Sequence, residues 1–171
     1  MAVGLKSKNM SDGNLEHYSQ VKQLIAKLPA ETTFHPSKVQ LEWVTEAEAK
    51  SKVRLPESFR RFVLEYDTIK LQGYWTFTVA PPEFSDDYPE DIFTFYRNSS
   101  EGNPTEYDKL LFLVTGEGDE CYFFPVIEGK ALDKVYVADA FSPEFCTPYA
   151  DSFYEFLVTE IPRSYPECFR H

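Results

Sequence analysis

Leu55-Pro56-Glu57-Ser58-Phe59-Arg60-Arg61-Phe62-Val63-Leu64-Glu65-Tyr66 is the stretch of this sequence that decides the fold. Proline suits the start of a helix, because the N–H that it lacks would be unpaired there. The apolar residues after it recur at the spacing i, i+3, i+4 and i+7, which places them on one face of a helix; they are Phe59, Phe62, Val63 and Tyr66. The stretch therefore predicts a tight corner at 55–56 and a helix over about 57–66.

The residues just before this corner predict a second helix. Thr45 and Glu48 have the spacing of a capping box, in which each side chain bonds the other's backbone N–H, and this indicates a helix over about 46–53. Residues 39–44 alternate between apolar and polar side chains, which predicts a short strand ahead of that helix. The expected order is strand, helix, Leu-Pro corner and helix.

The same reasoning assigns the rest of the chain. Helices are predicted over 11–28 and from Ser152 to a stop at Pro162, with strands over 74–79, 110–114, 120–126 and 134–138. Residues 83–91 and 97–106 read as loops, and 92–96 fits either a short strand or a helical turn. Short turns between the last three strands indicate an antiparallel meander. We therefore expect a flexible tail over 1–10 and a single α+β domain over 11–171. We expect a central, mostly antiparallel sheet, with the N-terminal, Leu-Pro-corner and C-terminal helices packed on it.

Composition supports a folded domain with an uneven charge. The chain has 171 residues, 43% of them hydrophobic and 16% aromatic, and a formal net charge of −11. Residues 65–120 hold 13 acids and 3 bases, whereas residues 1–64 hold 7 acids and 10 bases. This acidity disfavours direct binding of nucleic acid, which needs cations against phosphates, and favours a basic protein partner. The alternative is that the charge only keeps the protein soluble.

Three motifs together resemble the SUKH superfamily of Smi/Knr-type domains. They are the Leu-Pro corner, the strand–glycine turn–strand segment 110–124 and the closing helix 150–157, and they span roughly residues 40–161. Where the family often has Asn-Gly-Gly after the second helix, this chain has the longer segment 66–73. The resemblance implies an immunity protein that sits in a toxin-producing bacterial cell and neutralises a cognate toxin, often a nuclease, by protein–protein contact. Other members of the family are scaffold or regulatory proteins, which is the alternative that it leaves open.

The expected partner surface is acidic and aromatic. Carboxylates interleaved with aromatic side chains suit a basic partner, since aromatic residues often anchor interfaces. We expect these residues to contribute to one negative surface: Glu83, Phe84, Asp86, Asp87, Tyr88, Glu90, Asp91, Glu117, Asp119 and Glu120. The expected partner is a basic toxin, such as a nuclease.

No catalytic, cofactor or metal site is predicted. His17, His35 and His171 have no paired-ligand spacing, and the three cysteines form no CxxC motif, which favours free thiols in a reducing compartment. The acidic run 86–91 lacks the EF-hand pattern, and the Gly-rich segment 116–119 lacks the lysine of a phosphate loop. Because no catalytic motif is present, we expect no enzyme activity. Because no signal peptide or membrane span is evident, we expect a cytoplasmic protein. A hydrolase with paired carboxylates is the less favoured alternative.

Overall fold

The N-terminal part of the protein is mainly helical, with one pair of short strands. The computed structural model describes residues 11–102, 110–116, 120–139 and 142–170. The N-terminal part contains helix α1 (Asp12–Ile25), the 3-10 turn η1 (Ala30–Thr32), helix α2 (Leu41–Ser51) and helix α3 (Glu57–Tyr66). It continues with strands β1 (Lys70–Leu71) and β2 (Tyr74–Thr76), the 3-10 turn η2 (Pro82–Asp87) and helix α4 (Ile92–Gly102).

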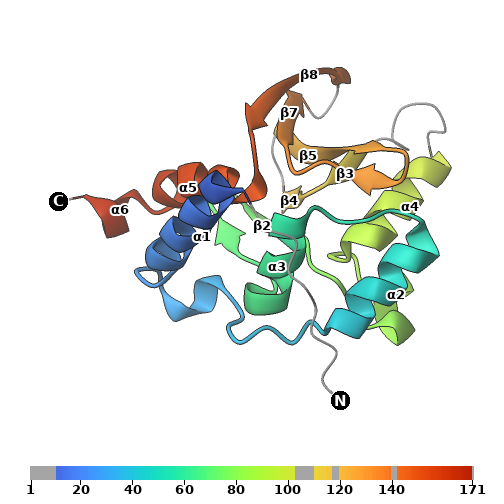
Figure 1. Cartoon of the computed structure of the whole chain (residues 1–171), viewed down its shortest axis with the longest axis horizontal. Helices are drawn as coiled ribbons and strands as arrows, with labels where there is room; N and C mark the ends of the chain where they lie inside the picture. Colours follow the sequence, from blue (N-terminus) through green and yellow to red (C-terminus); the bar gives the residue numbers. More distant parts are fainter. Residues whose placement is uncertain (1–10, 103–109, 117–119, 140–141, 171) are drawn as a thin grey trace.

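The C-terminal part is mainly strands and ends in helices. Its strands are β3 (Leu110–Phe112), β4 (Val114–Gly116), β5 (Glu120–Ile127), β6 (Lys130–Ala131), β7 (Val135–Asp139) and β8 (Ser142–Ala150). Helices α5 (Phe153–Ser164) and α6 (Pro166–Phe169) follow. Figure 1 shows α1 beside α5 at one side of the molecule and α2 beside α4 at the other, with α3 between them.

The helix after the Leu-Pro corner forms as predicted. All four residues of its apolar face are buried, and Phe59 and Phe62 make edge contacts with Phe153 of α5, with ring centroids 5.0 and 5.2 Å apart. Pro56 is the N-cap of α3 rather than its first helical residue. The corner therefore turns the chain so that α3 packs against α5.

The prediction for α2 was wrong at its start. The helix begins at Leu41, so the expected strand over 39–44 does not form. Thr45 lies inside the helix and its hydroxyl donates to the carbonyl of Leu41 at 2.9 Å, as a threonine in a helix can. Glu48 does not cap the helix; its carboxylate accepts from the N–H of Leu55 at 2.9 Å and faces Arg60 at 3.4 Å. A short alternating segment fits a strand or a helix equally well, and here the burial of Val44 favours the helix.

The strands form two antiparallel sheets. The smaller one has the order β1-β2-β4, and the larger one has the order β3-β5-β7-β8, with β6 paired to β5. Neighbouring β3, β5 and β7 confirm the predicted meander. Strand β8 was not predicted; it contains Pro143 and Pro148, and lies at an edge of the larger sheet, where proline is tolerated. The predicted α+β class with antiparallel sheets is confirmed.

Two further boundaries differ from the expectation. Residues 92–96, left open between strand and turn, start helix α4, so the expected loop from 97 is helical as far as Gly102. Helix α5 continues through Pro162 to Ser164 instead of stopping there. Its start is as predicted, because the hydroxyl of Ser152 accepts from the N–H of Glu155 at 3.1 Å. A proline close to a C-terminal end removes one backbone bond without ending the helix.

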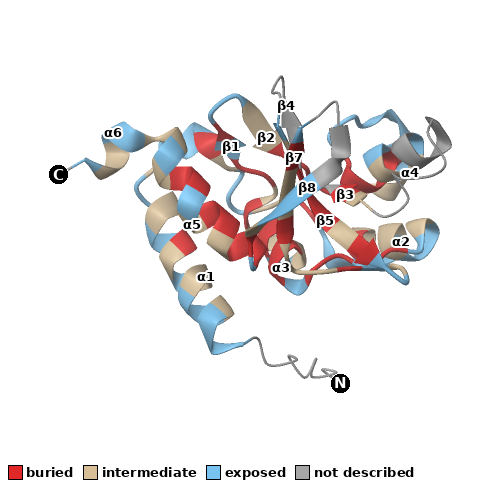
Figure 2. Ribbon diagram, turned by 90° about the horizontal axis from the view of Figure 1, so that it is seen from above, coloured by how far each residue is buried: buried red, intermediate tan, exposed pale blue. Residues whose placement is uncertain are grey.

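The core is aromatic and lies between helices α3 and α5 and strand β5. Phe124 of β5 contacts Phe59 and Phe153, with centroids 5.6 and 6.1 Å apart. Figure 2 shows the buried residues concentrated where these three elements meet. None of the described helices is both long and apolar enough to cross a lipid bilayer.

Candidate protein-docking surface

The turn η2 presents aromatic and acidic side chains to solvent. A hydrogen bond attaches its backbone to α4: the carbonyl of the buried Ser85 accepts from the hydroxyl of Thr94 at 2.6 Å. Phe84 is 59% exposed and Tyr88 is 43% exposed, although side chains of this size are usually buried. The exposed carboxylates beside them are Glu83, Asp87 and Glu90. We call these five exposed residues, Glu83, Phe84, Asp87, Tyr88 and Glu90, the η2 surface.

Asp86 ties η2 to two helices. Its carboxylate lies 3.3 Å from the ammonium of Lys50 in α2 and 2.9 Å from the guanidinium of Arg97 in α4. The hydrogen bond from Lys50 and the positive charges of Lys50 and Arg97 lower the pKa of Asp86. Because both of these cations face it, Asp86 contributes less free negative charge than its neighbours and serves to hold the turn in place.

Asp91 does not belong to the exposed surface that we expected. Its side chain is buried, with 1% of the residue exposed, and it accepts hydrogen bonds from the N–H groups of Ala80 at 2.9 Å and Thr94 at 2.7 Å. The bond to Thr94 is that of an N-cap residue at the start of α4. Burial raises the pKa of Asp91, and the two backbone donors oppose that rise. Its role is to stabilise the helix, and its assignment to the partner site is corrected.

Asp67 is a feature of this region that the sequence did not reveal. It has φ 62° and ψ −77°, and the N–H of Thr68 bonds the carbonyl of Tyr66 at 2.8 Å, which together form a tight γ-turn. This turn opens segment 66–73, the segment in which the sequence departs from the resemblance described above. The Asp67 carboxylate accepts from the hydroxyl of Thr78, and burial raises its pKa. Burial, followed by the charges of Glu90 and Asp67, raises the pKa of Tyr88.

Of the three acids in the second acidic segment, Glu120 is the one that the structure describes, and it lies apart from the η2 surface. Glu117 and Asp119 fall outside the described residues, while Glu120 is exposed at the start of β5. In the smaller sheet Gly116 lies opposite Tyr74, whereas Glu90 bonds Thr78, four residues further along the same stretch. Four residues of extended chain span about 13 Å. The pairing therefore puts Glu120 and Glu90 towards opposite ends of residues 74–78, so Glu120 does not extend the η2 surface.

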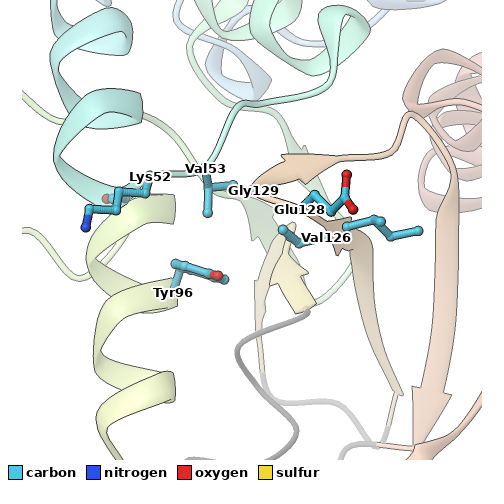
Figure 3. A pocket seen from close by; sticks show the side chains of 8 residues that line it. Lys52, Val53, Tyr96, Val126, Glu128 and Gly129 are labelled. Atoms are coloured by element: carbon cyan, nitrogen blue, oxygen red, sulfur yellow. The ribbon is translucent and has the colours of Figure 1, made fainter.

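An open hollow of about 500 Å³ lies between the end of α2, helix α4 and the β5–β6 hairpin (Figure 3). Its described lining consists of Ser51, Lys52, Val53, Tyr96, Val126, Ile127, Glu128 and Gly129. Tyr96 points into it from α4 toward the strands. Glu128 is the single carboxylate of this lining, so the hollow lacks the pair of convergent acids that a carboxylate-based hydrolase would need.

Among the described residues, the buried hydroxyl of Tyr154 has no hydrogen-bond partner, whereas the buried carboxylate of Glu160 is paired. The buried carboxylate of Glu160 accepts from the hydroxyls of Tyr74, at 2.9 Å, and Tyr149. Cys121, Cys146 and Cys168 are free thiols. Within the described residues, no three His, Cys, Asp or Glu side chains are grouped so that they could hold a metal ion.

Comparison with known families places the protein. The fold and the exposed η2 surface are those of an α+β domain suited to protein contacts, and the family model SUKH_6, described as SMI1-KNR4 cell-wall, matches residues 41–157. Because the match covers more than half of the chain, the protein belongs to this family, as the sequence motifs predicted. The matched region runs from the first residue of α2 into α5 and includes η2. Proteins of this family are generally non-catalytic. The comparison with curated proteins gave no match.

Proposed function

We propose that this protein binds and neutralises a basic protein toxin through the η2 surface. The observation that carries the proposal is the exposure of Phe84 and Tyr88, 59% and 43%, between the exposed carboxylates of Glu83, Asp87 and Glu90. Aromatic side chains are the commonest energetic anchors of protein interfaces, and surrounding acids select a cationic partner. The hydrogen bond from Thr94 and the ion pairs of Asp86 hold the turn in place. Binding therefore does not have to meet the entropic cost of ordering it.

Two further points support a toxin of the nuclease class. A nuclease must present cations to phosphate, so an acidic protein with a net charge of −11 is electrostatically complementary to it. The SUKH resemblance implies immunity proteins, and the chain belongs to that family. A scaffold or regulatory role on the same fold is the second candidate, and the cell-wall description of the matching family favours it.

The experiment is a growth-protection assay against a basic toxin, chosen by screening the products of the genes next to this protein's gene for toxicity. Cells expressing that toxin receive wild-type protein, the double variant Phe84→Ala/Tyr88→Ala, or the control variant Glu16→Lys, which alters an exposed acid on α1. We expect wild type and the control to protect, and the double variant to lose protection and about 30-fold or more in affinity. A folded double variant that protects as well as wild type would rule out the η2 surface. Binding without any toxicity to neutralise would favour the regulatory role.

A charge variant tests the electrostatic part. Changing Glu83, Asp87 and Glu90 together to lysine avoids the buried Asp91 and the paired Asp86, and exposed substitutions seldom cost more than about 0.5 kcal/mol each. We expect the rate of association with the toxin to fall steeply in this variant. The wild-type rate should fall with added salt, because exposed charges are screened beyond about 8–10 Å at ordinary ionic strength. Stopped-flow measurements at low and high salt give both comparisons. A salt-independent wild-type rate would contradict electrostatic docking.

A further inference from the structure

A second exposed aromatic group lies outside the η2 surface. Phe34 is 53% exposed and stacks on Trp75, with ring centroids 6.0 Å apart and an angle of 25° between the planes. The exposed Lys70, opposite Trp75 in the β1–β2 pair, places its ammonium 5.8 Å from the Trp75 ring. We call Phe34, Lys70 and Trp75 the Trp75 platform. A tryptophan, a phenylalanine and a cation together have the character of an interface anchor.

The platform and the η2 surface are connected around the C-terminal end of α3. The N–H of Phe34 bonds the carbonyl of Tyr66 at 3.4 Å, and Asp67 is the next residue. Thr78 then donates its hydroxyl to Asp67 and its N–H to the carbonyl of Glu90, the latter at 3.0 Å. Figure 1 shows the segment between α1 and α2 running along the lower edge of the molecule, past the end of α3. The two groups are thus linked through consecutive contacts.

The two groups differ in charge but share exposed aromatic side chains. Lys70 gives the platform a positive charge, and the exposed Lys38 lies close enough to Asp67, the residue that links the two groups, to oppose in part the rise that burial causes in the pKa of its carboxyl. The η2 surface carries only acids among its charged members. A face that is cationic at one end and anionic at the other complements a copy of itself turned through 180°, which is the geometry of a two-fold symmetric interface.

We propose that this face pairs with a second copy of the chain, so that the Trp75 platform of each protomer packs against the η2 surface of the other. Charge complementarity and the exposed aromatic rings at both ends favour this occupant over an unrelated acidic or basic protein, which would match one end and be repelled at the other. The proposal does not depend on toxin binding. If both hold, the second copy and the toxin compete for the η2 surface.

Complementary charge variants test this pairing in full-length protein. One variant is Lys70→Glu, and the other is the triple variant Glu83→Lys/Asp87→Lys/Glu90→Lys. Each alone places like charges at both ends of its own homodimer, whereas a mixture of the two places unlike charges at both ends of the heterodimer. Sedimentation velocity at low salt measures the association, circular dichroism checks the fold, and Glu16→Lys is the control for a change of net charge.

We expect wild type and Glu16→Lys to dimerise, each variant alone to dimerise about tenfold or more weakly, and the mixture to recover wild-type association. A variant that merely disturbed the fold could not be rescued by mixing. Wild-type protein that stays monomeric up to about 100 μM, or a mixture no stronger than its separate components, would overturn the proposal. That failure would leave toxin neutralisation intact, because the growth-protection assay does not involve the Trp75 platform.

Discussion

The carboxylate of Asp91 can be buried because two backbone N–H groups, one from α4 and one from the chain after β2, donate to it. The N–H of Thr94 would otherwise be one of the unpaired groups at the helix start, and the N–H of Ala80 comes from the chain leaving the small sheet. Charge is costly in an apolar surrounding, and the direction of the pKa shift of Asp91 reflects that cost. Its value to the fold is therefore as an acceptor of hydrogen bonds.

Three substitutions at Asp91 separate hydrogen bonding from charge. Asp91→Asn keeps one of the two acceptor oxygens, so it can still cap α4 at the N–H of Thr94 but leaves the N–H of Ala80 unpaired, and we expect about half of the loss in the free energy of unfolding that Asp91→Ala causes. Asp91→Ala leaves buried N–H groups of Ala80 and Thr94 unpaired, which should cost about 1–3 kcal/mol. Asp91→Lys should prevent folding, because it buries an unpaired cation beside those donors. Urea unfolding measures all three, and equal stability of the Asn and Ala variants would contradict this role.

At the scale of elements, the β5–β6 hairpin is built against the end of α2. Its two-residue turn has positive φ at both Glu128 and Gly129, the combination whose twist suits an antiparallel pair. The N–H of Arg54 bonds the carbonyl of Gly129 at 2.8 Å, so the turn is attached to the chain leaving α2. A side chain at Gly129 would place its Cβ 2.8 Å from the carbonyl oxygen of Lys52. Glycine is thus required at position 129 because of the positive φ and because there is no room for a side chain.

Gly73 provides the matched control for that requirement. It also has a positive φ, 86° against 71° for Gly129, but a Cβ added there would meet no atom within 4 Å. Gly73→Ala should therefore cost only the conformational penalty, about 1–2 kcal/mol. Gly129→Ala should cost clearly more, because the hairpin or the end of α2 must also shift. Thermal and urea unfolding compare the two variants, and equal losses would mean that the contact with Lys52 carries no energy.

The helix α3, the start of α5 and the meander were predicted correctly, because the residues that specify them are close together in the sequence. The apolar face of α3 and the Ser152 cap of α5 each lie within a few consecutive residues, and the meander follows from short turns. Strand β8 could not be read in this way, since its two prolines argue against a strand unless its place at an edge is known. The start of α2 was missed because six alternating residues have no unique period.

In the candidate sites too, features specified by neighbouring residues could be predicted, and features that depend on distant contacts could not. Exposed aromatics among acids identify η2 from the sequence, because the whole group is local. Asp91 was misplaced because residues 92–96 were left between strand and turn, and without a helix there is no N-cap. The stacking of Phe34 on Trp75 depends on a segment before α2 lying next to the β1–β2 pair, and nothing in either stretch specifies that contact.

At the scale of the whole molecule, tyrosine hydroxyls join distant parts of the chain. Glu160 of α5 holds Tyr74 of β2 and Tyr149 of β8, and so ties both sheets to the C-terminal helix. Burial, followed by the hydrogen bond and negative charge of Glu160, raises the pKa of Tyr149 to about 12. Burial and the charge of Glu65 raise the pKa of Tyr66 to about 12 as well. Both hydroxyls are therefore held neutral well above the value of about 10 expected in an unfolded chain.

This coupling predicts that the protein loses stability in alkali. A group whose pKa is raised on folding contributes stability that is fully present below its unfolded pKa and is lost as the pH rises through its folded pKa. The stability that Tyr66 and Tyr149 contribute should therefore begin to fall near pH 10 and be lost near pH 12. Tyr149→Phe should be about 1–3 kcal/mol less stable at pH 8, because Glu160 loses a donor, yet its stability should fall less steeply above pH 10. Urea unfolding between pH 8 and 11 measures both effects, and parallel pH curves for wild type and Tyr149→Phe would show that this hydroxyl is not part of the coupling.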